Sequence, residues 1–264
     1  MPDWVVTILL GCLEGITEFL PVSSTGHLLL AEHWMGIHRS DLFNIVIQAG
    51  AVLAVIPLFW GRVSRMLFDW RDPEVRDYAA KLALAFVITG VGGLLLEKAG
   101  FELPETPLPV GVALLVGGLL FILVERWVGG RPVTDQIGWT IAVAVGIGQL
   151  IAAVFPGTSR SGATILMCLL LGLSRTSATE FSFLVGIPTM LAASGLKIVK
   201  AVIRPAGSPG LAEDWIAVAL GFLTAAIVSF IVVRWLLGYV KHHTFAVFGW
   251  YRILLAVLVL TLLR

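Results

Sequence analysis

The fold of this chain is decided by the stretch Glu14-Gly-Ile-Thr-Glu-Phe-Leu-Pro-Val-Ser-Ser-Thr-Gly-His27. It breaks up an apolar region and leaves charge-free runs at residues 4–13 and 19–31. Neither run has the roughly 20 residues that a helix needs to cross the hydrocarbon core of a bilayer. We therefore expect this region to enter the membrane, turn near the proline and return to the same side as a re-entrant helical hairpin.

A second region, residues 136–173, repeats this design around the stretch Pro156-Gly-Thr-Ser-Arg-Ser-Gly-Ala-Thr164. A shift of 135 residues places Glu14 on Gln149, Pro21 on Pro156 and Ser24 on Ser159. Each region is followed by three apolar spans, so the second copy starts from the opposite face of the membrane. We expect a single membrane domain of two inverted repeats, residues 1–135 and 136–264, whose hairpins meet near the midplane.

The composition points to the bilayer as the solvent. Hydrophobic residues make up 58% of the chain and charged residues 13%, against about 25% charged in soluble domains. Six stretches are long enough to cross: residues 42–61, 78–96, 106–124, 181–203, 215–233 and 244–263. The predicted fold class is an all-α polytopic membrane protein with about six transmembrane helices and two re-entrant helical hairpins. Broken backbone survives in a membrane only inside protein or beside water, so we also expect an internal polar chamber.

Charge indicates the orientation and the partners. Ten basic residues fall at one predicted end, and six at the other: Arg39, Lys98, Lys197, Lys200, Arg204 and Arg264. The end with more Lys and Arg is expected in the cytoplasm, which leaves both termini and the mouth of the first hairpin outside. A formal net charge of +1 offers no excess for nucleic acid. We expect membrane lipids as partners and leave a homodimer open.

Two acids lie within the first broken region. Ionisable residues inside a membrane are expensive and mark functional sites. Glu14 and Glu18 are four residues apart, so a helix presents both on one face. Such a pair suits a divalent cation, Mg²⁺ or Ca²⁺, or acid–base chemistry. The alternative is that buried partners such as Arg252 neutralise them.

The link from Pro21 to His27 combines hydroxyl groups with the free amides of a helix start, which suits an oxyanion. Ser23, Ser24 and Thr25 are candidate N-caps and phosphate ligands. His27 is a candidate acid–base group or can orient a hydroxyl nucleophile. The alternative is plain N-capping with a histidine at the membrane interface.

The second link adds Arg160, whose planar fork suits phosphate oxygens. Hydroxyls and amides nearby complete a candidate phosphate cradle: Ser159, Ser161, Gly162 and Thr164. A structural arginine at a helix C-terminus is the alternative. The lysine of a P-loop is missing, and Ser161 replaces the last glycine of a nucleophile elbow, so neither soluble enzyme class fits.

Together these groups predict a phosphoryl-transfer site for a lipid phosphate or pyrophosphate. Gln48, Gln149 and Glu180 are candidates to support the ligands, although an interhelical hydrogen bond would explain each equally well. Arg252 interrupts the last span, and we expect it in a buried ion pair rather than on the substrate.

At these residues the sequence resembles the undecaprenyl-diphosphatase family, the bacitracin-resistance type of bacterial inner-membrane phosphatase. The two quoted stretches are similar to that family's two motifs in order and spacing, and segments 46–50 and 180–184 extend the likeness over nearly the whole chain. The resemblance implies removal of one phosphate from undecaprenyl pyrophosphate, which recycles the lipid carrier for peptidoglycan synthesis and confers bacitracin resistance. It also implies an active site open to the periplasm.

The resemblance also assigns roles. It implies that Glu14 and Glu18 are tied to a divalent cation, that Ser24 is the nucleophile with His27 beside it, and that Arg160 binds phosphate, flanked by Ser159, Ser161 and Thr164. Water activated by Glu18 or His27 would use the same residues without a covalent intermediate. Two other classes remain open: a transporter such as a polyprenyl-phosphate flippase, which inverted repeats also suit, and a structural membrane protein.

Overall fold

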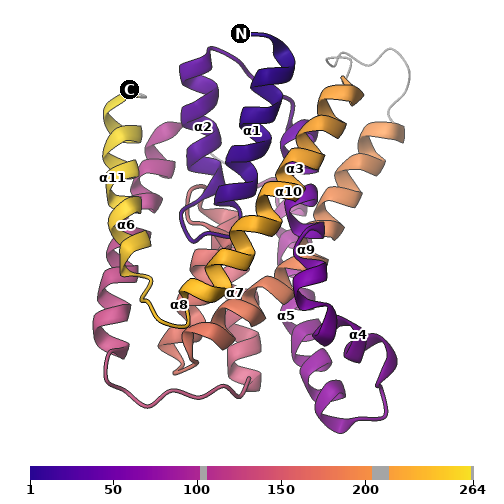
Figure 1. Ribbon diagram of the computed structural model, residues 1–264, viewed down its shortest axis with the longest axis vertical. Coiled ribbons are helices and arrows are strands. Elements are labelled where there is room, and N and C mark those ends of the chain that lie inside the picture. The colour runs from indigo at the N-terminus through magenta and orange to yellow at the C-terminus, as the bar shows by residue number, and fades with distance from the viewer. Residues whose placement is uncertain (102–105, 204–213, 263–264) are drawn as a thin grey trace.

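The computed structural model describes residues 1–101, 106–203 and 214–262, and every named element in these ranges is helical (Figure 1). The elements are α1 (Asp3–Thr17), α2 (Ser24–Met35), α3 (Asp41–Leu53), η1 (Ile56–Phe59), α4 (Trp60–Phe68), α5 (Pro73–Lys98), α6 (Pro107–Val128), α7 (Trp139–Val154), α8 (Arg160–Leu170), α9 (Arg175–Ile203), α10 (Trp215–Tyr239) and α11 (Ala246–Leu262). The prediction of an all-α polytopic membrane protein is confirmed.

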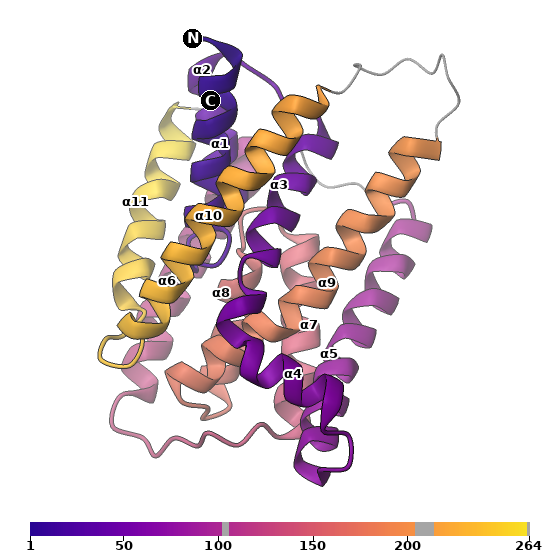
Figure 2. The same ribbon diagram turned by 45° about the vertical axis from the view of Figure 1, so that its right-hand side comes forward.

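Two helical hairpins enter the molecule from opposite ends. In Figure 1, α1 descends from the upper end and α2 returns to it, whereas α7 rises from the lower end and α8 returns there. Figure 2 shows the two turns facing each other in the middle of the molecule. Fully buried aromatic rings pack at the turns: Phe19 lies edge-on to Phe183, and Phe121 lies beside Gly162 of α8. The broken regions of the sequence thus become two short hairpins.

The remaining helices run between the two ends. Five helical segments are long and apolar enough to cross a membrane: Leu42–Phe68, Pro73–Lys98, Pro107–Val128, Arg175–Lys200 and Trp215–Tyr239. The sixth predicted span, 244–263, forms the 17-residue helix α11, although its last residue lies outside the described part of the chain. The first span is not continuous, because Pro57 lacks an amide hydrogen, and η1 separates α3 from α4 there.

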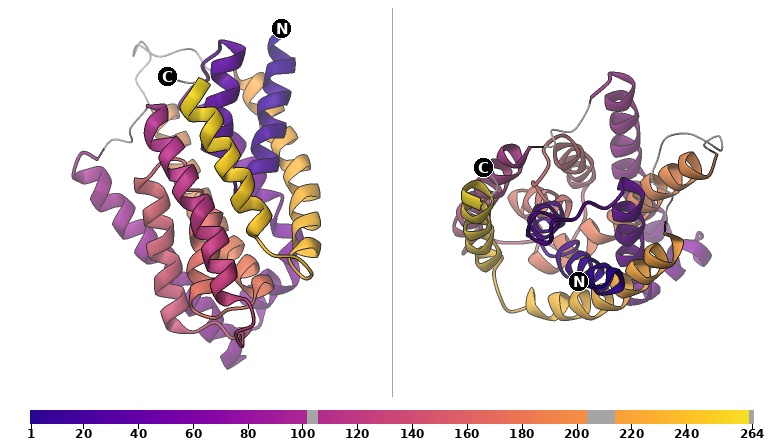
Figure 3. Two further views of the ribbon diagram at one scale, coloured as in Figure 1. Left: turned by 90° about the vertical axis from the view of Figure 1, so that its left-hand side faces the viewer. Right: turned by 90° about the horizontal axis from the view of Figure 1, so that it is seen from above.

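Equivalent helices of the two predicted repeats make equivalent contacts. Helix α1 packs on α10 as α7 packs on α5, while α6 packs on α11 and α3 packs on α9. The start of α1 and the end of α11 both lie at the end of the molecule from which α1 enters (Figure 3). The division into repeats at residues 135 and 136 stays a prediction that this pairing supports.

Aromatic and basic residues mark the two ends. All nine tryptophans are exposed, between 47% and 62% of their surface, and they lie near helix ends, as interfacial rings do. The ten basic residues of the richer group lie on segments that begin or end at the lower end of Figure 1, such as α4 and the start of α9. In the smaller group, Arg204 and Arg264 lie outside the described residues.

Candidate active site

The acidic pair lies at the end of α1. Glu14 is in the last turn of this helix, and Glu18 caps it. Glu14 is completely buried and Glu18 is only 7% exposed. Neither carboxylate oxygen of Glu14 has a hydrogen-bond partner in the described part of the chain, and the charged neighbours of this carboxylate are Glu18 and Arg160. Such a buried acid requires a proton or a cation to offset its lost hydration.

Glu18 is where the two hairpins meet. Its Oε1 accepts a hydrogen bond from Nη2 of Arg160 at 3.0 Å. Its Oε2 accepts another from the hydroxyl of Ser24 at 2.9 Å. Ser24 begins α2 and Arg160 begins α8, so the ion pair joins one hairpin to the other. The structure thereby brings Glu14, Glu18, Ser24 and Arg160 into one buried site.

Each turn leads into its second helix through a serine with an unusual backbone. Ser23 caps α2 and accepts from the amide of Gly26, and Ser159 caps α8 and accepts from the amide of Gly162. Their φ angles are +75° and +69°, which residues with a side chain rarely adopt. Ser159 therefore corresponds to Ser23, whereas the 135-residue shift pairs it with Ser24. The reason is one extra residue between the proline and the cap of the second turn.

Arg160 has donors without partners. Its guanidinium lies against α9, where a Cβ added to Gly186 would come within 1.9 Å of Nη1. Nη2 binds Glu18, but Nε and Nη1 are buried with no hydrogen-bond partner in the described structure. The Glu18–Arg160 ion pair is thus flanked by two carboxylate oxygens of Glu14 and two guanidinium nitrogens of Arg160 that have no partner among the described residues. Phosphate oxygens match such guanidinium donors.

The other predicted hydroxyl groups differ in what they contact. Ser161 donates to the carbonyl oxygen of Leu20 at 3.2 Å and lies 3.1 Å from the hydroxyl of Ser159, so it ties α8 to the first turn. Thr164 donates to carbonyl oxygens of its own helix, those of Arg160 and Ser161. Thr25 is exposed at the start of α2.

His27 is held by two neighbours. Its Nδ1 lies 2.7 Å from the carbonyl oxygen of Ser23, and its Nε2 lies 2.7 Å from the hydroxyl of Tyr251 on α11. A carbonyl can only accept, so in the neutral ring Nδ1 donates and Nε2 accepts from Tyr251. Within the described residues, His27 makes no hydrogen bond to Ser24 or to the acids. Sequence reasoning missed Tyr251, because nothing in its spacing links it to His27.

In the described structure, none of the candidate supporting residues hydrogen-bonds to Glu18 or Arg160. Gln149 donates to the hydroxyl of Thr89 on α5 at 2.9 Å, which is the interhelical bond weighed above. Gln48 is half-buried and makes no side-chain hydrogen bond among the described residues. Glu180 pairs with Arg62 near the start of α9.

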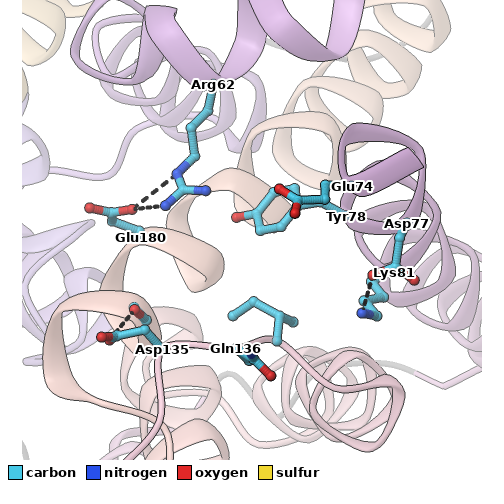
Figure 4. A pocket seen from close by; sticks show the side chains of 10 residues that line it. Arg62, Glu74, Asp77, Tyr78, Lys81, Asp135, Gln136 and Glu180 are labelled. Carbon is cyan, nitrogen blue, oxygen red and sulfur yellow. Dashed lines mark hydrogen bonds and ion pairs between the residues drawn. The ribbon is translucent and has the colours of Figure 1, made fainter. Parts of the chain in front are cut away.

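That pair lines a cavity of about 390 Å³ among α4, α5, α9 and the loop before α7 (Figure 4). Arg62 Nη2 lies 3.1 Å from Glu180 Oε2. Asp135, in the loop, accepts from the hydroxyls of Ser174 and Ser177, and these bonds hold the pKa of its carboxyl below its usual value. None of the predicted phosphate-site residues lines this cavity.

Arg252 corrects one expectation. It is completely buried, but it forms no salt bridge with a carboxylate of the described chain. Its guanidinium instead donates to carbonyl oxygens of Pro21, Ala113 and Gly157. The physical reason is that two of these carbonyls lie in broken turns, where they are free to accept. The ion-pair prediction for Arg252 is wrong, and the nearest cation to the acids is Arg160.

The fold and the site define a class: a polytopic helical membrane protein with a buried charged centre assembled from two hairpins. The family described as bacitracin resistance protein BacA matches residues 7–258, and this chain belongs to that family.

Individual relatives agree with the family match. Proteins named undecaprenyl-diphosphatase from Rhizobium etli, Xanthomonas euvesicatoria and Xylella fastidiosa are 54%, 50% and 51% identical to it. The matches cover 98%, 97% and 99% of this chain and 96%, 95% and 99% of those proteins. The resemblance drawn from the two motifs is confirmed.

Proposed function

We propose that this protein is an integral-membrane phosphatase that hydrolyses undecaprenyl diphosphate to undecaprenyl phosphate and inorganic phosphate. The observation that carries the proposal is the Glu18–Arg160 ion pair, which joins the two hairpins and leaves two guanidinium nitrogens of Arg160 without partners among the described residues. The names of relatives at 50% identity or more support the same reaction.

Binding of the diphosphate would rest on Arg160 and on two helix starts. The N-termini of α2 and α8 both begin in the turns that face each other, and a helix N-terminus attracts anions through its amides and its dipole. The terminal phosphate would take up the open donors of Arg160. The prenyl chain would remain among the apolar helices, as its solubility requires.

The chemical step follows from the hydrogen bond between Ser24 and Glu18. As the Ser24 oxygen attacks the terminal phosphorus, its proton passes to Glu18, and the bond from that phosphorus to the bridging oxygen breaks. Undecaprenyl phosphate leaves with the bridging oxygen, and water then releases phosphate from the serine. Water activated by Glu18 or His27 would give the same products in one step.

A divalent cation fits part of this site. In the part of the chain that the structure describes, Glu14 has two buried oxygens without partners, whereas both oxygens of Glu18 accept hydrogen bonds. We propose that Glu14 is the main protein ligand, with Glu18 beside it, for Mg²⁺ or Ca²⁺. When bound, the ion would offset charge on the diphosphate.

We also propose a location. The protein would lie in the bacterial inner membrane with the mouth of the α1–α2 hairpin towards the periplasm. The unequal distribution of Lys and Arg supports this orientation. Membrane lipids would then cover the exposed apolar faces of α5, α10 and α11.

The test follows phosphate release from a polyprenyl diphosphate by the purified protein in detergent, with and without a chelator. Arg160→Ala should lower kcat by about 100- to 1000-fold, the usual effect of removing one donor aimed at developing negative charge. Arg62→Gln, in the separate cavity of Figure 4, is the matched control and should keep normal turnover. No release by the wild type, or full release by Arg160→Ala, would refute the proposal.

A further inference from the structure

Arg252 is an arginine inside the membrane region whose partners are all backbone. It lies on α11 and has no exposed surface. Its Nη1 donates to the carbonyl of Pro21 at 3.3 Å, and its Nη2 donates to those of Ala113 and Gly157 at 3.1 Å each. Burying a charge is costly, so three bonds to neutral acceptors need an explanation.

The positions of the carbonyl groups that Arg252 binds explain why it is buried there. Pro21 belongs to the turn of the first hairpin and Gly157 to the turn of the second. A carbonyl in a broken helix has lost its intrahelical donor, and a lipid environment cannot replace it. A single guanidinium therefore satisfies one carbonyl from each turn while a third bond anchors it to α6.

The space for this side chain is shaped by a glycine. A Cβ added to Gly117 of α6 would lie 2.3 Å from Nη2 of Arg252. Any larger residue there would have to displace the guanidinium. A lysine at position 252 would keep the charge but, as a point donor, could not reproduce a planar fork with fixed geometry.

We propose that Arg252 is a positioning residue, which holds the two turns in register so that Ser24 and Arg160 meet at Glu18. Among the described residues it forms no ion pair with Glu14 or Glu18, and it acts through the backbone of both turns. The inference rests on the proposed phosphatase function. Because small misplacement of reacting groups costs up to about 100-fold in rate, the effect of losing Arg252 belongs in kcat.

The experiment compares kcat and KM of Arg252→Lys, Gly117→Ala and the double variant with those of the wild type. Each single variant should lower kcat by at least about 10-fold with KM little changed. Their effects should not add, because both disturb the same guanidinium. Gly93→Ala, where an added Cβ meets nothing within 4 Å, is the matched control on α5.

The outcomes distinguish the proposed function from the role of Arg252. An inactive wild type would refute the proposed function, not the role of Arg252. With an active wild type, normal kcat in both single variants overturns the positioning role. A raised KM at unchanged kcat would mean contact with the substrate, which also overturns it. Loss of the folded, monodisperse protein in both single variants would show a purely structural residue and overturn it as well.

Discussion

At the scale of single residues, Glu18 has two partners of different kinds. One carboxylate oxygen accepts a hydrogen bond from the hydroxyl of Ser24, and the other accepts one from the guanidinium of Arg160. The Ser24 hydroxyl therefore points at a carboxylate oxygen that can take up the departing serine proton, while the other oxygen is bound to the guanidinium. One side chain thus connects the candidate nucleophile to the candidate phosphate ligand.

Replacement of the Ser24 hydroxyl tests the covalent route. Ser24→Ala should lower kcat by at least about 100-fold, because it removes the attacking oxygen and the group whose proton Glu18 accepts. Phosphate release measures the effect, and mass spectrometry of acid-quenched protein should find phosphoserine at position 24 in the wild type. Ser64→Ala on α4 is the control, since among the described residues this serine bonds only to Gly61 of its own helix. Near-normal turnover of Ser24→Ala would leave only direct attack by water.

Several of these residues could be predicted from the sequence, for a physical reason. Glu14, Glu18 and Arg160 stand out because charge is rare in apolar segments. The partners of His27 and Arg252 could not be predicted in the same way. Carbonyl oxygens freed in a broken turn leave no mark in the sequence, so the sequence pattern favours a carboxylate as the partner of Arg252.

Among the structural elements, the turns of the two hairpins share a backbone conformation but differ in length. Both second helices begin at a serine of positive φ, but the second turn has one more residue after its proline. The longer turn contains Gly157, which has φ +90° and lies so close to α6 that an added Cβ would be 2.7 Å from the carbonyl oxygen of Val110. A fixed shift along the sequence cannot detect such an insertion, and for this reason it pairs Ser159 with Ser24.

Gly157 is therefore expected to tolerate no side chain. Gly157→Ala should destabilise the protein by at least about 1–2 kcal/mol from its backbone conformation alone, before the contact with α6 is counted. Thermal unfolding in detergent measures the change. Gly90→Ala, inside α5 with nothing within 4 Å of the added Cβ, should be neutral or slightly stabilising because alanine favours helix. Equal unfolding temperatures for both variants would contradict this account of the turn.

For the molecule as a whole, the lengths of the apolar stretches predicted six crossing segments and two broken regions. In the described residues, five of the six are helical segments long enough to cross, the sixth is the shorter helix α11, and both broken regions form hairpins; the first span is interrupted at Pro57. What could not be predicted is how the helices pair, because that depends on which small residues let backbones approach. The pairing of α1 with α10 and of α7 with α5 is such a case.

Chemical labelling tests the orientation. In a variant without Cys12 and Cys168, single cysteines replace His38, in the loop between α2 and α3, and Arg71, in the loop between α4 and α5. A membrane-impermeant maleimide should label His38→Cys in intact cells, and Arg71→Cys only after the membrane is opened. The reverse pattern would place the basic end outside, against the rule for Lys and Arg.

The ion pair at the centre has a further consequence, because Glu18 precedes the loop between α6 and α7 while Arg160 follows it. A chain severed in that loop would give two fragments, one with the acids and the nucleophile and the other with the guanidinium. Neither fragment alone would contain the complete site for binding and cleaving the diphosphate. Activity would return only when the fragments insert in opposite senses and reassemble side by side.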